Sequence, residues 1–385
     1  MKYQRNLKIT YAFEFFMNLN FMQALWMTYF AFKGLSLWEI GLAESMFHAV
    51  SLLMEIPTGV IADLYGRKLS RMLGTCMRLL YLLVLFYVDS LPMALLAFTL
   101  TALSYNLESG SDTALVYDSL IADGQSELFT RVQGKREVVL QGAAMLGVFI
   151  GGILADISYT HAIAYTFLIT SLALVLAAFF IEAPHHEENH RPKLRQHFRA
   201  MMTALKGQYE LLALMGMAGF FLSSLVTLHF YIGIVLKDEG LSLSVISLYL
   251  LISPLGGLLT GLSLKYLAHH AQKILLIAPF FVPVFLTLVL FSPTRILSLF
   301  FLGVLDTLIF VFTNQRINSM IQSAQRASLL SVNGMMFSLV MVILFPLVGF
   351  VGDLVQLKTA LFGLAAFSAV LAFIFYRWGH HHLQS

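Results

Sequence analysis

Long apolar segments alternate with short polar ones along the whole of this 385-residue chain. Each segment has about twenty mostly apolar residues, which is the length that a helix needs to cross the hydrocarbon core of a bilayer. Charged or turn-forming residues end each of them. The twelve predicted spans cover residues 7–32, 39–62, 70–88, 91–117, 137–157, 161–182, 210–236, 241–264, 273–291, 294–314, 329–352 and 356–377. This pattern predicts an all-α membrane protein with twelve transmembrane helices.

Residues 183–209 form the longest polar stretch and separate six spans from six. We therefore expect an N-terminal six-helix bundle at 1–182, a cytoplasmic linker at 183–209, and a C-terminal six-helix bundle with a short tail at 210–385. The halves match each other weakly, since Pro57, Gly59 and Lys68 align with Pro254, Gly256 and Lys265. Such pseudo-symmetric halves are typical of secondary transporters. The frequent use of Pro and Gly near membrane helix ends explains the same match without a repeat.

The composition indicates that lipid is the main solvent of this chain. Hydrophobic residues make up 58% and charged residues only 12%, which is about half the usual charge of a soluble domain. The net charge is only +3 and the basic residues are spread along the chain, which argues against a nucleic-acid partner. Because Cys76 is the single cysteine, no internal disulfide is possible.

Lysine and arginine predict the orientation of the spans. With both termini inside, the inner segments carry 19 of these residues and the outer loops carry four, namely Lys33, Lys237, Arg295 and Lys358. The sequence therefore predicts a multi-pass protein of the cell (inner) membrane with both termini in the cytoplasm. The basic N-terminus and the apolar run to about Phe32 are interpreted as a retained first span, since the run is long enough to cross the membrane.

The inner loop between the second and third spans has the sequence GVIADLYGRKLSR. Gly59 would let another helix approach the second span closely, and Gly66 permits a turn with positive φ. The spacing of small, acidic and basic residues in this loop resembles the signature loop of the major facilitator superfamily. The positions that carry the resemblance are Gly59, Asp63, Gly66, Arg67 and Lys68. The six-plus-six arrangement and the longer central linker match the family as well, so the resemblance covers the whole chain.

The resemblance implies the two-bundle fold of this family and transport by alternating access. In the family, the signature loop is thought to act as a conformational latch between the two halves on the cytoplasmic side. The expected partner of Asp63 here is the start of span eleven, near Ser331 and Gly334, because a helix N-terminus suits a carboxylate. A basic loop that only sets the topology is the simpler explanation.

Span five contains a second, partial match to the same family. Gly147, Gly151 and Gly152 coincide with glycines that antiporters of this superfamily often carry, whereas Ala143 and Val148 replace the expected Gly and Pro. Small residues allow close packing between helices. The match favours export, while generic small-residue packing explains it equally well.

Glu108 and Asp112 lie within span four, and carboxylates at membrane depth are candidates for function by default. Their spacing of four residues places them on one face of a continuous helix. Two close carboxylates resist joint ionisation in a low dielectric, so this pair is the predicted proton-coupling element. The alternative is a structural pair that is neutralised by Arg78 of span three, the predicted charge partner.

Four further polar residues are predicted to line the substrate cavity. Glu14 and Asn18 share a face of span one, which lines the cavity in this superfamily, and His229 lies in span seven. Asn106 occupies the position at which drug antiporters of the superfamily usually carry Arg. The usual coupling scheme of those antiporters therefore cannot simply be transferred to this chain.

The predicted function is secondary active transport by alternating access, as proton-coupled export (antiport) of small amphipathic or cationic compounds. No phosphate-binding loop or catalytic constellation is found, so we expect no ATP, no enzymatic activity, no bound metal and no cofactor except the proton as coupling ion. The expected partners are a small-molecule substrate and the lipid bilayer, with the chain acting as a monomer. A proton-coupled importer of a metabolite or metal chelate remains the alternative, followed by a lipid-moving protein or a membrane-embedded enzyme.

Overall fold

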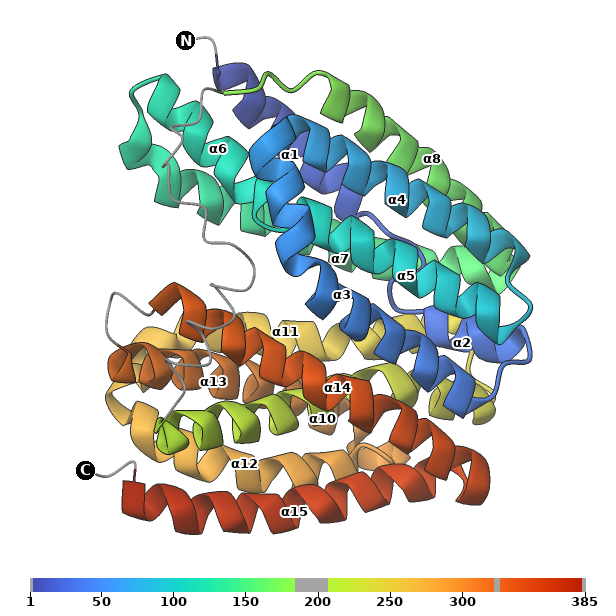
Figure 1. The fold of residues 1–385 in the computed structure, drawn as a ribbon. Helices are drawn as coiled ribbons and strands as arrows, with labels where there is room; N and C mark the ends of the chain where they lie inside the picture. The colour runs from blue at the N-terminus through green and yellow to red at the C-terminus, as the bar shows by residue number, and fades with distance from the viewer. Residues whose placement is uncertain (1–2, 184–206, 322–325, 383–385) are drawn as a thin grey trace. The chain divides into compact units, whose positions relative to one another are not determined.

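A computed structural model describes residues 3–183, 207–321 and 326–382, and every regular element in these ranges is a helix (Figure 1). The first half contains α1 (Gln4–Asn18), α2 (Trp26–Phe32), α3 (Leu37–Tyr65), α4 (Arg67–Tyr87), α5 (Leu91–Glu108), α6 (Ser111–Ala122), α7 (Phe129–Ile157) and α8 (Tyr159–Ala178). The second half contains α10 (Tyr209–Asp238), α11 (Leu243–Leu267), α12 (Ala271–Leu288), α13 (Arg295–Met320), α14 (Arg326–Val355) and α15 (Leu357–His382). Single 3-10 turns precede three of them, at Ser126–Leu128, Ala268–His270 and Ser292–Thr294.

Nine stretches of the described residues are long and apolar enough to cross a membrane. One of them, Leu243–Leu288, contains both α11 and α12, so the nine stretches account for ten of the predicted spans. The other two predicted spans, 7–32 and 91–117, are each divided between two helices. The twelve-span fold expected from the sequence is confirmed, with two of its spans interrupted.

Span four is interrupted at Gly110, whose φ is +79°. Glycine adopts this conformation at no steric cost, and the helices α5 and α6 end and begin on either side of it, at Glu108 and Ser111. The expectation of one continuous helix over residues 91–117 is therefore wrong. Hydropathy does not detect such a break, because glycine is frequent in membrane helices.

Span one is interrupted between α1 and α2, and the connecting segment lies against α7 and α8. The backbone N–H of Phe21 donates to Thr166 Oγ1 at 3.1 Å. A Cβ atom at Gly147 would lie 2.8 Å from the backbone of Asn20, and one at Gly151 would lie 2.2 Å from Phe21 O. The absence of side chains at these two glycines thus lets the segment contact α7 directly.

The chain divides into two compact units. Unit 1 comprises Met1–Leu35, Met46–Arg191 and Leu241–Leu248, and unit 2 comprises Ser36–Ser45, Pro192–Gly240 and Tyr249–Ser385. Each unit therefore includes a short segment from the other half of the sequence: the start of α3 belongs to unit 2, and the start of α11 belongs to unit 1. A single boundary in the predicted linker does not capture this exchange. Most of that linker, residues 184–206, lies outside the described residues.

In unit 1, α4 packs against α5, α6 and α8, and α1 packs against α6, α7 and α8 (Figure 1). A buried apolar cluster joins α1, α6 and α8 through Phe13, Met17, Leu115, Ala173, Ala177 and Phe180. This packing brings polar residues of α1, α4, α5, α6 and α7 to one place.

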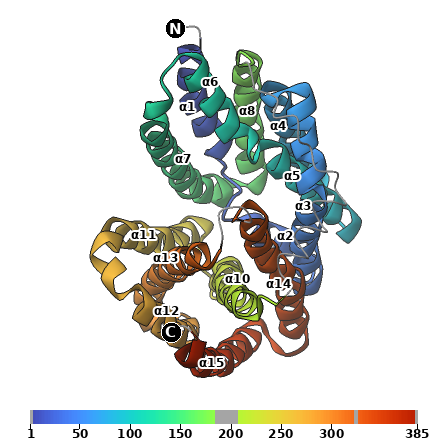
Figure 2. The ribbon, with the colours of Figure 1, turned by 60° about the vertical axis from the view of Figure 1, so that its left-hand side comes forward.

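In unit 2, α10 is the most enclosed helix, with 67% of its most apolar window buried. It contacts α12, α13, α14 and α15, and Figure 2 shows it among these helices. Its inward residues Leu211, Leu214 and Met215 join a core that includes Leu275, Ile317 and Phe375. Apolar burial is supplemented by hydrogen bonds from Ser223 Oγ to Phe337 O and from Tyr231 OH to Phe345 O.

Candidate functional site

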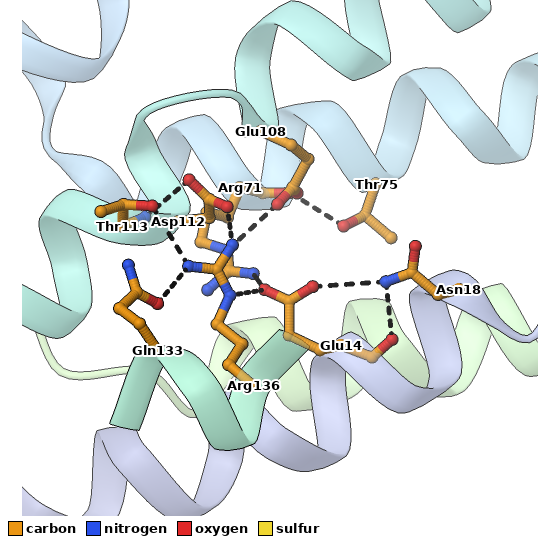
Figure 3. Close-up of polar contacts among 9 residues, drawn as sticks. All are labelled: Glu14, Asn18, Arg71, Thr75, Glu108, Asp112, Thr113, Gln133 and Arg136. Atoms are coloured by element: carbon orange, nitrogen blue, oxygen red, sulfur yellow. Dashed lines mark hydrogen bonds and ion pairs between the residues drawn. The ribbon is translucent and has the colours of Figure 1, made fainter. Parts of the chain in front are cut away.

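Five charged side chains from five helices of unit 1 form a buried network (Figure 3). They are Glu14 of α1, Arg71 of α4, Glu108 of α5, Asp112 of α6 and Arg136 of α7. Arg71 pairs with Glu14 at 2.8 Å and with Glu108 at 3.1 Å. Arg136 pairs with Glu14 at 3.1 Å and also with Asp112. None of the five side chains is more than 22% exposed.

Arg71 links Glu14 to Glu108, and its side chain is completely buried. Its Nη2 donates to Glu14 Oε1 and its Nε donates to Glu108 Oε2. The rings of Phe13 and Phe180 lie 4.2 and 5.0 Å from Arg71 Cζ. Aromatic faces attract a guanidinium, and they exclude the water that would weaken its ion pairs. Arg71 therefore binds both carboxylates strongly.

Arg136 connects α7 to Glu14 and to Asp112. Its Nε donates to Glu14 Oε1 at 3.1 Å, and its Nη1 donates to Thr113 Oγ1 at 3.2 Å and to Gln133 Oε1 at 3.0 Å. The ion pair with Asp112 uses Nη2. Because a guanidinium has donors at fixed angles, this set of acceptors fixes α6 and α7 relative to α1.

Glu14 is shared between the two arginines through a single oxygen, Oε1. Its other oxygen, Oε2, accepts a hydrogen bond from Asn18 Nδ2 at 3.3 Å, and Asn18 Nδ2 also donates to the backbone carbonyl of Glu14 at 2.8 Å. The predicted contact between Glu14 and Asn18 is thus present in α1. Their role in binding substrate stays a prediction.

The network contains three carboxylates and two guanidiniums, so it carries one excess negative charge when every group is ionised. An excess charge at membrane depth is costly unless another cation or a proton balances it. Two polar atoms of the network, Arg71 Nη1 and Glu108 Oε1, are buried and have no hydrogen-bond partner in the described part of the protein. The network can therefore take up one further positive charge or polar group.

Gly74, one turn after Arg71 in α4, makes room for Glu108. A Cβ atom at Gly74 would lie 3.1 Å from Glu108 Cγ and 3.1 Å from the backbone oxygen of Ser104. The neighbouring Ser70 donates to Leu107 O at 2.6 Å, so α4 and α5 are in direct contact here. This contact positions the Glu108 carboxylate beside Arg71.

The structure changes how Glu108 and Asp112 relate to each other. The break at Gly110 places them in two different helices, so they do not share a face of one helix. Each carboxylate pairs with its own arginine, Arg71 or Arg136. Arg78, the partner expected from the sequence, forms no ion pair with either carboxylate among the described residues. The charge of Arg78 still acts on Glu108 without direct contact, so its role as a charge partner stays a prediction.

Arg71 and Arg136 are thus the site residues that sequence analysis missed. Both were counted among the basic residues of inner loops, yet Arg71 has 0% and Arg136 has 8% relative exposure. A signal was present in the sequence: three carboxylates within predicted spans need positive partners in a low dielectric. Arg71 is the second residue of the predicted span 70–88, and Arg136 directly precedes the predicted span 137–157.

The signature loop is held by an acidic residue that follows α8. Glu182 accepts hydrogen bonds from the backbone N–H groups of Arg67 at 2.7 Å and Lys68 at 2.9 Å, at the N-terminus of α4. Gly66 has φ +98°, and a Cβ atom there would lie 2.7 Å from Glu182 Cδ. Asp63 forms an ion pair with Arg67. The positive φ of Gly66, its lack of a side chain and the Glu182 carboxylate thus determine how α4 begins.

The close approach expected at Gly59 is absent from the described structure, since a Cβ atom there would meet nothing within 4 Å. That expectation is wrong for the described residues. The proposed contact of Asp63 with span eleven concerns the other unit, and the side chain of Ser331 lies outside the described residues. The latch function of the loop stays a prediction.

Asn106 connects α5 to α3. It accepts a hydrogen bond from Ser51 Oγ at 2.7 Å and donates one to Ser51 O at 2.8 Å. His229, in α10 of unit 2, is half-buried, and its ring lies 5.8 Å from that of Phe230. Gly152 of α7 faces Ser247 at the start of α11, within unit 1. Participation of Asn106 and His229 in a substrate cavity stays a prediction.

Residues 8–343 match the family model of the Major Facilitator Superfamily. A curated relative, the "Uncharacterized MFS-type transporter YxaM" of Bacillus subtilis (strain 168), is 26% identical over 173 residues, which are 45% of this chain and 42% of that protein. The chain therefore aligns with less than half the length of this relative.

Solved structures of transporters share the fold. The nucleoside transporter NupG superposes with a TM-score of 0.77 at 15% identity, over 97% of this chain and 98% of that one. A bacterial homologue of the human lysosomal transporter Spinster, in an inward-facing and occupied conformation, gives a TM-score of 0.72 at 12% identity, over 100% of this chain and 97% of that one.

The chain belongs to the Major Facilitator Superfamily, as the signature loop indicated. It is a multi-pass membrane protein, and membership of this family of transporters points to a transport role and not to an enzymatic one.

Proposed function

We propose that this protein is a proton-coupled antiporter that exports small amphipathic or cationic compounds by alternating access. The observation that carries the proposal is the excess carboxylate in the network of Glu14, Arg71, Glu108, Asp112 and Arg136. One positive charge balances this network. A proton and a cationic substrate therefore compete for the same negative charge, and such competition produces exchange.

Glu108 is the proposed protonation site. One of its oxygens pairs with Arg71, while the other, Oε1, is buried without a partner in the described protein. Asp112 is bound by Arg136 and by the backbone N–H of Thr113 at 2.6 Å, so its charge is better compensated. Protonation of Glu108 weakens its attraction to Arg71 and frees this guanidinium for Glu14, which changes the packing of α4 on α5 and α1.

In this proposal the protein acts as a monomer in the cell membrane. The excess of lysine and arginine in the segments assigned to the inside supports cytoplasmic termini and a cytoplasmic signature loop. Energy comes from the proton gradient.

Substrate-driven proton flux in proteoliposomes tests the proposal. A panel of lipophilic cations serves as the probe set, with a pH-sensitive dye inside the vesicles. We expect E108Q to abolish coupled proton flux and D112N to reduce it. E137Q is the matched control, because Glu137 follows Arg136 in α7 but is exposed and bonded to Gln141. Unchanged flux in both E108Q and D112N would reject the assignment.

A proton-coupled importer on the same fold is the second candidate. Asn106 favours it, since drug antiporters of the family usually carry arginine there, whereas this asparagine binds Ser51 of α3. The direction of net substrate movement under an imposed pH gradient separates the two: export requires movement against the proton influx, and import requires movement with it.

A further inference from the structure

The sequence Gly-Leu-Ser-Leu occurs at residues 34–37 and 240–243, where it leads directly into α3 and α11, and a third copy lies inside α11 at residues 261–264. The glycines end the preceding helices α2 and α10 with φ values of +88° and +86°, as is usual for a helix C-cap. The serines, Ser36 and Ser242, then occupy the N-cap positions of α3 and α11. In both cases the chain passes from one unit to the other within these four residues.

Two carboxylates bind the first turns of these helices. Asp353, near the end of α14, accepts hydrogen bonds from Leu37 N at 3.0 Å and Trp38 N at 2.8 Å. Asp156, near the end of α7, accepts hydrogen bonds from Leu243 N at 2.6 Å and Ser244 N at 3.1 Å. Each carboxylate thus takes the first two N–H groups of a helix whose positive dipole end favours a negative charge.

The third N–H group of each helix is satisfied by its own N-cap serine. Ser36 Oγ accepts from Glu39 N at 3.2 Å, and Ser242 Oγ accepts from Val245 N at 3.4 Å. The carboxylate of Glu39 returns to Ser36 N at 2.9 Å, which completes a capping box in α3. Each helix start is therefore stabilised by local contacts that persist when the distant aspartate leaves.

A glycine one turn before each aspartate lets the helices touch. A Cβ atom at Gly349 would lie 2.2 Å from Leu37 O, and one at Gly152 would lie 2.9 Å from Leu243 O. Gly152 and Gly349 are 197 residues apart, as are Asp156 and Asp353. The same spacing relates Pro57 to Pro254 and Gly59 to Gly256. The two contacts are therefore equivalent positions of an internal repeat.

We propose that Asp353 and Asp156 are two equivalent latches that hold the first turns of α3 and α11, and that both are released when the transporter changes conformation. The Asp353 latch holds the start of α3, whereas the signature loop follows the end of that helix, so this latch acts at the other end of the span. Release costs little because the N-cap serines remain bonded, and water at the membrane surface can solvate two N–H groups and a carboxylate. This inference rests on alternating access and not on proton coupling or export.

Spin labels at residues 38 and 350 report on the first latch. The rings of Trp38 and Phe350 are 5.5 Å apart, and both side chains are partly exposed, so they accept labels. Replacing Cys76 by Ser removes the only native cysteine. Label-to-label distances are then measured by electron paramagnetic resonance in lipid nanodiscs.

We expect D353N to raise the ratio of separated to close labels by about fivefold or more, because a carboxylate at a helix N-terminus is lost. G349A acts independently, by collision with Leu37 O, and we expect the same direction. The controls are E39Q, which removes a carboxylate that belongs to the same helix, and G363A, where a Cβ atom meets nothing within 4 Å.

The proposal is overturned if D353N and G349A, shown by thermal unfolding to be folded, give the wild-type distance distribution. The readout does not depend on transport. Failure of the proton-flux experiment with E108Q therefore leaves this result standing, and an unchanged label distance leaves the proposed coupling site untouched.

Discussion

Arg71 Nη2 and Glu14 Oε1 lie 2.8 Å apart between α4 and α1, and neither side chain is more than 7% exposed. The pair is the link between two halves of a network in which carboxylates outnumber guanidiniums. The two partners are therefore not equivalent. Loss of Arg71 increases the excess negative charge, whereas loss of the charge on Glu14 removes it.

This asymmetry predicts different costs for R71M and E14Q. We expect R71M to lower the free energy of unfolding by about 3–5 kcal/mol, because buried carboxylates lose their cation. E14Q should cost only about 1–2 kcal/mol, from weaker hydrogen bonds. The measurement is chemical unfolding in detergent. In the double variant, the loss of unfolding free energy should be less than the sum of the two single losses. Equal losses for the two single variants would show that the network has no excess charge.

Gly74 is predicted to be required for the position of Glu108. G74A should destabilise the protein by about 1–3 kcal/mol, the usual cost of overpacking, because the backbone of Ser104 prevents α4 from moving. Coupled proton flux should fall as the carboxylate is displaced from Arg71. Gly142 of α7 is the matched control, since a Cβ atom there meets nothing within 4 Å. Equal effects of G74A and G142A would contradict the prediction.

Gly66 and Glu182 are predicted to be energetically coupled. G66A combines backbone strain at φ +98° with a collision against the Glu182 carboxylate, whereas E182A removes the cap of α4, which costs about 0.5–2 kcal/mol. In the E182A background, the destabilisation by G66A should no longer include the collision with the carboxylate and should come only from the backbone strain. A double-mutant cycle on thermal stability measures the difference. Strictly additive effects would show that the carboxylate does not contact this turn.

Glu239 is predicted to make stability depend on pH. It accepts hydrogen bonds from Arg295 Nη1 at 2.8 Å, Arg295 Nη2 at 2.9 Å and Lys358 Nζ at 2.8 Å. Burial raises the pKa of Glu239, but the hydrogen bonds and positive charges outweigh it and hold the pKa below its ordinary value of 4.5. A lowered folded pKa gives stability that is present above the unfolded value and is lost as the pH falls through the folded one.

The melting temperature measured from about pH 7 to about pH 3 should therefore fall less steeply in E239Q than in the wild type. E239Q should also be less stable at neutral pH, since Arg295 is 2% exposed and loses its carboxylate. K358M is the control: Lys358 is 45% exposed, and surface pairs contribute little, so the pH profile should be kept. Parallel profiles for E239Q and the wild type would contradict the assignment.

The contacts of Asp353 and Asp156 with the first turns of α3 and α11 use sequence motifs whose pairing cannot be read from the sequence. Gly-Leu-Ser-Leu leads into both α3 and α11, and Gly-x-x-x-Asp recurs at 152–156 in α7 and 349–353 in α14, yet the two motifs are far apart in the sequence. Only the fold brings Asp353 to Leu37, across more than three hundred residues of chain. Local propensity explains the caps of Ser36 and Ser242, and tertiary packing explains which aspartate reaches each helix.

For the charged network of unit 1, too, the sequence determines some features and tertiary packing determines others. Apolar periodicity, the arginine and lysine bias and the signature loop determined the spans and the family, because each depends on residues near one another in sequence. The break at Gly110 and the partners of Glu108 and Asp112 depended on packing between helices. In the low dielectric of the interior, a buried charge is stable only beside an opposite charge. The sequence by itself therefore placed the carboxylates in the membrane, and only the tertiary structure decided that Arg71 and Arg136 bind them.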